Sequence, residues 1–275
     1  MKIFITGHKG FIGSEICRQS RALGHEIMGL EKPNRMENPP WDELKAFQPD
    51  ACIHAAWIAT PGEYTTSPLN KSHYLWSLQL IRGLIDLGTS GFVVLGTCAE
   101  YAPASVPLLE DTSLELPESP YAEEKHRLHQ ELKNIFSDSE ASLAWARIFY
   151  PYGPGEHPGR LISQIIQSRR EGKSLQLNNP MGVRDYIHVE DVASALLLCC
   201  QRRYHGSINI GTGRGIVLGD LGALIGLPGG VMTARMNIAN SLPADSVVAD
   251  IGKLKALGWR PRHGIESGLR TYSKI

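Results

Sequence analysis

KIFITGHKGFIG, residues 2–13, decides the fold of this 275-residue chain. Its first five residues form a short apolar run, which is typical of a buried strand. Glycines follow at positions 7, 10 and 13, directly after this run and at the start of the first predicted helix. A strand, a glycine turn and a helix in this order predict a dinucleotide-binding turn.

Each of the three glycines has its own physical task in such a turn. Gly7 lets the chain turn sharply, Gly10 removes a side chain that would block a pyrophosphate, and Gly13 permits close packing of the helix on the strand. The free N–H groups and the positive dipole end of the helix would then face the pyrophosphate. Because ordinary turns also collect glycine, the prediction depends on the strand and the helix on either side.

Apolar runs alternate with helical patterns through the first two thirds of the chain. The runs show no in–out alternation, which indicates strands buried on both faces, as in a parallel sheet. We therefore predict an α/β fold, a doubly wound parallel sheet of the Rossmann type. The predicted strands are 2–6, 26–30, 51–56, 92–96, 143–149 and 207–211, and the predicted helices are 13–23, 41–47, 75–87, 121–136, 161–171 and 190–203.

The composition of the chain changes after Pro151, where residues 150–159, YPYGPGEHPG, form a loop rich in glycine and proline. We expect a dinucleotide-binding domain and a smaller substrate-binding lobe. The first would contain residues 1–150 plus about 189–213, and the second residues 151–188 plus 214–275. Open α/β sheets bind ligands at the carboxyl ends of their strands, so a lobe placed there would complete a cleft.

Charge and composition exclude several classes of function. Lys+Arg and Asp+Glu both number 28, so no global basic field would attract nucleic acid or an anionic membrane. No apolar run approaches the roughly 20 residues that span a bilayer, and the N-terminus reaches its glycines too early for a signal peptide. Five cysteines without CxxC spacing and ten scattered histidines predict reduced thiols, a cytoplasmic location and no metal site.

Residues near the end of the second predicted strand point to two different cofactors. Glu31 would hydrogen-bond the adenosine ribose hydroxyls and favour NAD. Lys9, Lys32 and Arg35 belong to the same corner of the fold and could neutralise the 2′-phosphate of NADP instead. The expected cofactor is therefore NAD or NADP, and the choice stays open.

Further motifs follow the glycine turn in a fixed order. They are HAA at 54–56, GTCAEY at 96–101, YxxxK at 121–125, RIFYPYGPG at 147–155, RDYIHVEDVA at 184–193, NIGTG at 209–213 and LGWRP at 257–261. This set resembles the extended short-chain dehydrogenase/reductase family, and within it the NAD-dependent epimerase/dehydratase group that acts on nucleotide sugars. The resemblance spans nearly the whole chain.

The resemblance implies a catalytic triad of Thr97, Tyr121 and Lys125. Counting back from Tyr101 selects Thr97 as the hydroxyl residue, whereas a gap of one residue would select Cys98. A helix places the tyrosine and the lysine of YxxxK on one face. The ammonium, with the positive nicotinamide of an oxidised cofactor, would lower the pKa of the phenol. The phenol could then exchange a proton with the substrate while hydride moves to or from the cofactor.

The resemblance also implies the remaining contacts of the site. It points to Arg184 for the substrate phosphates, with Arg160 as a second candidate, since a guanidinium can hold a phosphate with two N–H groups. The expected cofactor-binding residues are Gly7, Lys9, Gly10, Phe11, Ile12, Gly13, Glu31, Lys32, Ala55, Ala56, Tyr121, Lys125 and Phe149. The expected substrate-binding residues are Thr97, Cys98, Tyr150, Arg160 and Arg184.

Departures from the family pattern narrow the expected reaction. Dehydratase relatives carry an Asp–Glu pair after the triad threonine, where this chain has Cys98 and Ala99, so dehydration is disfavoured. Tyr150 and His73 replace two asparagines of the family pattern, which disfavours a standard UDP-galactose epimerase. We expect reduction of the 4-keto group of a nucleoside-diphosphate deoxysugar. The alternative is a C4 epimerase that retains NAD, and a third reading is an inactive cofactor-sensing regulator.

The expected partners are a nucleoside-diphosphate sugar and a second copy of the chain. Relatives commonly dimerise through the two long helices that follow the third and fourth strands. In this sequence those helices are 75–87 and 121–136, and the first carries an apolar stripe.

Overall fold

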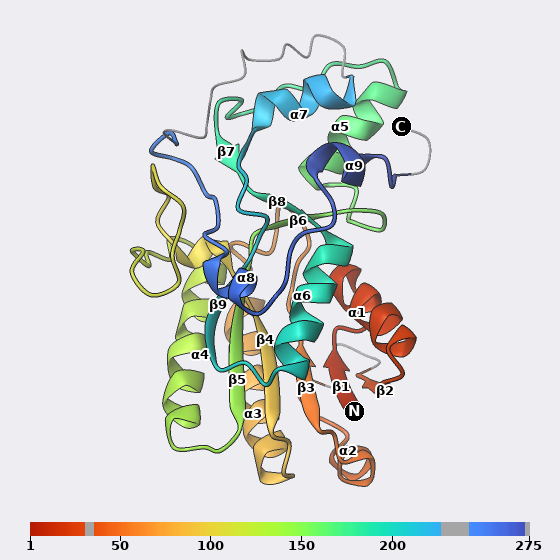
Figure 1. Cartoon of the computed structure of the whole chain (residues 1–275), viewed down its shortest axis with the longest axis vertical. Helices are drawn as coiled ribbons and strands as arrows, with labels where there is room; N and C mark the ends of the chain where they lie inside the picture. Colours follow the sequence, from red (N-terminus) through yellow and green to blue (C-terminus); the bar gives the residue numbers. More distant parts are fainter. Residues whose placement is uncertain (31–35, 227–241, 273–275) are drawn as a thin grey trace. The chain divides into compact units, whose positions relative to one another are not determined.

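The computed structural model describes residues 1–30, 36–226 and 242–272 (Figure 1). By its backbone contacts the chain divides into two compact units. The first is Met1–Glu100, Glu115–Arg147 and Ala193–Ile208, and the second is Tyr101–Leu114, Ile148–Val192 and Asn209–Ile275. The domain boundaries expected from the sequence stay a prediction. The glycine turn and the expected triad both belong to the first unit.

The first unit is built on a parallel sheet (Figure 1). β1 pairs in parallel with both β2 and β3, and β3 pairs in parallel with β4. The prediction of a Rossmann-type α/β fold is confirmed, and every predicted strand is present with ends that differ by about two residues at most. The strands are β1 (Lys2–Thr6), β2 (Glu26–Gly29), β3 (Ala51–His54), β4 (Gly91–Thr97), β5 (Ser142–Ile148) and β9 (Gly206–Ile210), in the order β2-β1-β3-β4-β5-β9.

The strand order creates a topological switch point beside β1. The chain passes from β1 to β2 on one side and then to β3 on the other side of β1. Thr6 at the end of β1 is therefore in register with His54 at the end of β3. In open α/β sheets, the crevice outside the carboxyl ends at such a point is where ligands bind.

The central strands β3 and β4 are buried along their whole length, and the strands are joined by helices. The helices are α1 (Phe11–Ala22), α2 (Trp41–Phe47), α3 (Leu69–Asp86), α4 (Pro120–Ser137) and α6 (Val189–Gln201). One apolar cluster joins α2, α3 and α4 to Phe4, Cys52 and Phe92 of neighbouring strands, since every second side chain of a strand points to one face. α3 begins at Leu69 rather than at residue 75, because the Asn70 side chain donates to carbonyls of the preceding turn.

The start of α4 is fixed by a local cap. Ser119 is extended, its hydroxyl accepts the Ala122 N–H at 3.2 Å, and Pro120 occupies the first helical position. Serine is a favoured N-cap residue, and proline fits the first turn because its missing N–H would have no helical partner there. This cap places Tyr121 in the first turn of α4, where its own N–H donates to Thr65 O at 3.1 Å.

The second unit consists of shorter elements. They are β6 (Tyr150–Tyr152), β7 (Val183–Arg184), β8 (Tyr186–His188), β10 (Ile216–Val217), α5 (Leu161–Arg170), α7 (Leu218–Ile225), α8 (Gly252–Ala256) and α9 (Ile265–Leu269). Strands of two or three residues are too short to show a period, so the sequence does not reveal them. A buried carboxylate helps to fix their geometry, because Asp185 accepts N–H groups from Thr212, Gly213 and Ala249.

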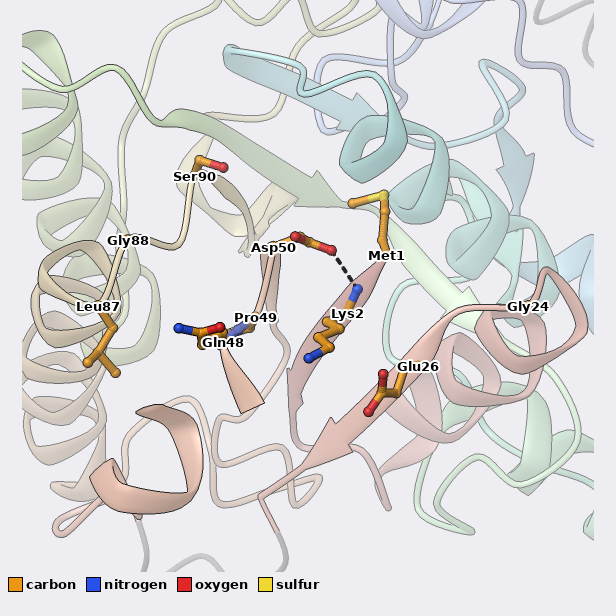
Figure 2. A pocket seen from close by; sticks show the side chains of 10 residues that line it. All are labelled: Met1, Lys2, Gly24, Glu26, Gln48, Pro49, Asp50, Leu87, Gly88 and Ser90. Carbon is orange, nitrogen blue, oxygen red and sulfur yellow. Dashed lines mark hydrogen bonds between the residues drawn. The ribbon is translucent and has the colours of Figure 1, made fainter. Parts of the chain in front are cut away.

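A pocket of about 610 Å³ opens in the first unit at the amino ends of the strands (Figure 2). Lys2 of β1, Glu26 of β2 and Asp50 before β3 line it, and the Lys2 N–H donates to Asp50 Oδ2 at 2.7 Å. The glycine turn follows the opposite, carboxyl end of β1. Because ligands of open α/β sheets bind at the carboxyl ends, this pocket is not a candidate for the cofactor.

Two further expectations concern thiols and metals. All five cysteines are buried thiols. In the second unit His188, Glu190 and His263 bring possible ligand atoms within 4.8 Å of one another. Both ring nitrogens of His188 already have partners, since Nδ1 accepts the Glu190 N–H and Nε2 contacts Thr271 Oγ1. The absence of a metal site stays a prediction. None of the helices within residues 1–30, 36–226 and 242–272 has the length and apolar character needed to cross a bilayer.

Candidate active site

The turn after β1 has the backbone that close approach to a phosphate requires. Gly7 has φ +67°, a left-handed conformation that residues with a side chain rarely adopt. A Cβ at Gly7 would lie 2.9 Å from Ala56 N, and a Cβ at Gly13 would lie 2.0 Å from Gly7 O. Both positions therefore require glycine because backbone atoms occupy the space of a side chain.

Helix α1 presents its amino end at this turn. Gly10 is its N-cap residue, no side chain caps the helix, and its first turn holds no acidic residue. The Gly10 N–H donates to Gly7 O at 2.9 Å, which closes the turn. The first N–H groups of a helix have no helical partner and carry the positive dipole end, so they suit a phosphate. The residues present thus fit the pyrophosphate of a nicotinamide dinucleotide.

Polar contacts hold the ends of β1 and β3 together beside the turn. Thr6 Oγ1 accepts the N–H groups of Ala55 and Ala56 at 3.1 Å each and contacts His54 Nδ1 at 2.8 Å. The other ring nitrogen of His54 contacts the Ser77 hydroxyl of α3 at 2.8 Å. Burial lowers the pKa of His54 to about 3, so the ring is neutral. These contacts fix Ala55 and Ala56 against Gly7, as the expected cofactor contacts require.

The structure describes only some of the residues that are expected to bind the adenosine ribose. Glu31, Lys32 and Arg35 lie outside the described residues, whereas Lys9 is described and exposed. His8 packs against the end of β2, where a Cβ on Gly29 would lie 2.5 Å from the imidazole ring. The choice between NAD and NADP accordingly stays open.

The three residues of the expected triad lie together in the first unit. Thr97 ends β4, and Tyr121 and Lys125 lie one turn apart in α4. The Thr97 hydroxyl is near enough to the Tyr121 phenol to lower its pKa. Lys125 is only 3% exposed, and its Nζ donates to Leu95 O at 2.6 Å. A hydroxyl, a phenol and an ammonium are thus gathered at the carboxyl end of β4.

Burial raises the pKa of Tyr121 above its ordinary value of about 10, and the nearby Thr97 opposes only part of this effect. The lowering expected from Lys125 together with an oxidised nicotinamide stays a prediction. The ammonium is directed to Leu95 O, and desolvation of the phenolate dominates. The phenol stays protonated at neutral pH, which is the form that a proton donor needs.

The ammonium of Lys125 also contacts an indole ring that the sequence analysis does not identify. Nζ lies 3.9 Å from the centroid of the Trp57 ring, a cation–π distance. Trp57 is held in place because its Nε1 donates to Asn70 Oδ1 at 2.8 Å. Burial lowers the pKa of Lys125 to about 7, and the charge of Glu100 opposes this shift. An aromatic residue directly after the HAA motif is the signal that could reveal Trp57.

Aromatic rings surround the phenol of Tyr121. Tyr64 meets it edge-on with ring centroids 4.9 Å apart, and Trp57 does so at 6.4 Å. His73 stacks on Trp57 at 5.4 Å, and burial lowers the pKa of this imidazole to about 4. At position 73, where the family pattern has an asparagine, this chain has a neutral imidazole ring that extends the row of stacked aromatic side chains.

The depressed pKa of Lys125 predicts a pH-dependent stability. A lysine in the unfolded chain titrates near about 10.4, so from about pH 7 to about pH 10 the unfolded chain binds a proton that the folded chain lacks. Through this group the unfolding free energy rises with pH by up to about 1.4 kcal/mol per unit. We expect Lys125→Met to remove this rise, as measured by urea unfolding at pH 7, 8 and 9.

Lys133 is the matched control for this experiment, because it is an exposed lysine on the same helix. Lys133→Met should keep the slope of the wild-type protein. Equal slopes for wild type and Lys125→Met would show that Lys125 does not titrate in a buried site.

The second unit contains three of the expected substrate-binding residues, Tyr150, Arg160 and Arg184. Tyr150 begins β6 and Arg184 ends β7, and the guanidinium carbon lies 5.9 Å from the tyrosine ring. Arg184 Nη1 also donates to Asp245 O at 2.7 Å. Arg160 directly precedes α5, and Phe149 is buried. The structure therefore brings Tyr150 and Arg184 together, on two short strands.

The amino end of α1 suits the pyrophosphate of a dinucleotide. The buried phenol of Tyr121 can donate a proton. Together they define a nicotinamide-dependent enzyme built on a Rossmann fold. The sequence matches the NAD dependent epimerase/dehydratase family over residues 3–211, and the chain belongs to this family. The expected resemblance is confirmed, and so is the expectation of a nicotinamide dinucleotide cofactor, NAD or NADP.

Several known proteins are similar to this chain over nearly its whole length. The UDP-glucose 4-epimerase of Bacillus subtilis (strain 168) is 27% identical over 321 residues, which cover 97% of this chain and 94% of the relative. The UDP-glucuronate 4-epimerase of Thermodesulfobacterium geofontis (strain OPF15) is 28% identical over 305 residues, covering 97% and 93%. The crystal structure of the Thermus thermophilus UDP-glucose 4-epimerase in complex with NAD has a TM-score of 0.80 at 25% identity, covering 98% of this chain and 97% of that one.

Proposed function

We propose that this protein reduces the 4-keto group of a nucleoside-diphosphate deoxysugar with NADH or NADPH. The observation that carries the proposal is the placement of Thr97 at the end of β4 and of Tyr121 and Lys125 in α4, without the acid and base of a dehydratase. Burial raises the pKa of the Tyr121 phenol, so the side chain is a neutral proton donor at physiological pH. Reduction of a ketone begins with such a donor, whereas oxidation of an alcohol begins with a base.

In the proposed reaction a bound nicotinamide supplies a hydride to the carbonyl carbon. The Tyr121 phenol gives its proton to the carbonyl oxygen, so that one hydride and one proton convert the ketone to an alcohol. The Thr97 hydroxyl, which lies near enough to the phenol to lower its pKa, orients that oxygen. Lys125 stabilises the phenolate that the transfer leaves behind. General acid catalysis of this kind contributes roughly 10²–10⁴-fold in rate.

The environment of Glu100 supports reduction over dehydration. Its carboxylate is fully buried, and it accepts the Thr97 N–H and the Arg147 Nε–H at 2.9 Å each. A carboxylate with these partners is not placed to exchange a proton with a sugar. The positions where dehydratases carry their acid and base hold Cys98 and Ala99.

The proposal assigns the substrate diphosphate to the guanidiniums of Arg184 and Arg160 in the second unit. Either can bind a phosphate oxygen pair with two N–H groups. It keeps Cys98 of the first unit and Tyr150 of the second unit each as an expected substrate contact, and it keeps the expectation of a homodimer formed through α3 and α4. Dimer formation is testable by light scattering of the purified protein.

A C4 epimerase is the second candidate, because the curated relatives named above are 4-epimerases. The same Tyr121 and Thr97 would serve an oxidation at C4, followed by reduction from the other face of the sugar. The cofactor would stay bound throughout and would show no net change.

The amount of reduced cofactor consumed per product formed distinguishes the reductase from the epimerase. The purified protein is incubated with nucleoside-diphosphate 4-keto-6-deoxysugars and, separately, with UDP-hexoses, in the presence of NADH or NADPH. The reductase predicts one equivalent of reduced cofactor consumed per alcohol formed. Isomerisation of a UDP-hexose without net change at the nicotinamide absorbance band would establish the epimerase instead. Cofactor binding without turnover of either substrate class would contradict both and would favour a cofactor-sensing protein.

A further inference from the structure

The ion pair between Glu100 and Arg147 is buried, and its carboxylate accepts the backbone N–H of Thr97. The proposed reaction does not use this pair. Glu100 and Arg147 are both 0% exposed, and Arg147 Nε lies 2.9 Å from Glu100 Oε2. Burying two charges is costly unless each is paired and hydrogen-bonded. We therefore expect the buried pair at the end of β4 to have a specific structural or functional role.

The carboxylate of Glu100 has a partner on each of its oxygens. Oε1 accepts the backbone N–H of Thr97 at 2.9 Å, and Oε2 accepts the Arg147 Nε–H. Trp145 Nε1 donates to both oxygens, at 3.0 and 3.1 Å. The short 3₁₀ turn Cys98–Glu100 brings this side chain back onto the strand that precedes it. The position of the carboxylate thus determines where β4 ends.

Arg147 holds the carboxylate from the other side. Its guanidinium also pairs with Glu115 and contacts His129 Nδ1 at 3.4 Å. Glu115 is partly exposed, so one end of the network reaches the surface while Glu100 stays enclosed. A planar guanidinium with N–H groups in fixed directions fixes a carboxylate more tightly than an ammonium would.

We infer that Glu100 is a positioning residue that holds the Thr97 hydroxyl beside the Tyr121 phenol. This inference rests on the proposed roles of Thr97 and Tyr121, and it holds for the reductase and the epimerase alike, since both use these two groups. Thr97 Oγ1 accepts the Ala99 N–H at 3.2 Å, so the same turn also orients the hydroxyl directly. Moving the turn would move the hydroxyl away from the reacting oxygen.

The charge of Glu100 also reaches the triad. It raises the pKa of both Tyr121 and Lys125. The other charged or titratable groups that face this carboxylate are Arg147 from β5 and His129 from α4, whose Nδ1 lies 3.9 Å from Oε2. Burial together with Arg147 lowers the pKa of His129 to about 3, so that ring stays neutral. Removing the charge should accordingly lower the pKa values of the tyrosine and the lysine together.

The test compares Glu100→Gln with Glu115→Gln. Both variants remove a carboxylate from Arg147, but only the first also changes the acceptor of the Thr97 N–H. We expect Glu100→Gln to lower kcat by roughly 10- to 100-fold, the scale of a misplaced catalytic group, with cofactor affinity unchanged. The alkaline limb of its kcat–pH profile should move to lower pH. Glu115→Gln should leave kcat and the profile close to those of the wild-type protein.

Glu100→Asp keeps the inference testable where Glu100→Gln does not fold. The aspartate retains a charge for Arg147 but is one methylene shorter, so its reach to Thr97 N is lost. We expect a reduced kcat at a melting temperature near that of wild type. Wild-type kcat and pH profile in a folded Glu100→Gln or Glu100→Asp protein would overturn the inference while leaving the proposed function intact. An inactive wild-type protein would instead count against the proposed function.

Discussion

Tyr121→Phe is expected to bind the cofactor as the wild-type protein does and to lose turnover by roughly 10²–10⁴-fold, the contribution of a general acid. The substitution keeps the aromatic ring that contacts Tyr64 and Trp57 and removes only the hydroxyl near Thr97. The fold and the glycine turn should therefore survive, because neither depends on this oxygen. Steady-state kinetics with the 4-keto substrate, together with cofactor titration by fluorescence, measure both quantities.

Tyr74→Phe is the matched control for this variant. Tyr74 is a buried tyrosine of α3 in the core of the first unit, 3% exposed. Loss of its hydroxyl should leave kcat close to that of the wild-type protein. Turnover in Tyr121→Phe that is similar to wild type would contradict the assignment of the proton donor.

Gly7→Ala has the second large expected effect, the loss of cofactor binding. An alanine at φ +67° costs about 1 kcal/mol in backbone strain, and its Cβ would lie 2.9 Å from Ala56 N. The ends of β1 and β3 must separate to relieve this contact, which moves the amino end of α1. We expect the dissociation constant for NADH or NADPH to rise by at least about 100-fold, equivalent to about 2.7 kcal/mol.

Gly24→Ala separates backbone strain from steric contact. Gly24 has φ +75°, but a Cβ there would meet no atom within 4 Å. This control should lose about 1 kcal/mol of stability and keep the cofactor affinity of the wild-type protein. Equal loss of affinity in the two variants, measured by isothermal titration calorimetry, would show that the turn after β1 is not the pyrophosphate site.

The parts of the fold that the sequence predicts are those whose signals are local. An apolar run, a glycine spacing and a helical pattern stand side by side in residues 2–13, and β1 and α1 follow them closely. The first turn of α3 has no side-chain cap, and Asn70 in it instead donates to carbonyls of the preceding turn, so the sequence carries no signal for this start. The strands of the second unit are missed because two or three residues show no period.

The candidate site likewise has features that the sequence predicts and features that only the folded chain reveals. The Tyr–Lys spacing is visible in the sequence because both residues share one helix face, and the structure brings Thr97 to them. The partner of Glu100 is Arg147, 47 positions away, and only the folded chain reveals that contact. The direction of the Tyr121 pKa shift also depends on burial, which no spacing predicts.

Transfer of deuterium from the cofactor to the sugar tests the central claim most directly. The protein is supplied with a nucleoside-diphosphate 4-keto-6-deoxysugar and with cofactor labelled at the transferable position of the nicotinamide ring. The product is then examined by mass spectrometry and NMR. The account predicts one deuterium at C4 of the sugar for each cofactor oxidised. A product without deuterium, or with the label at another carbon, would contradict it.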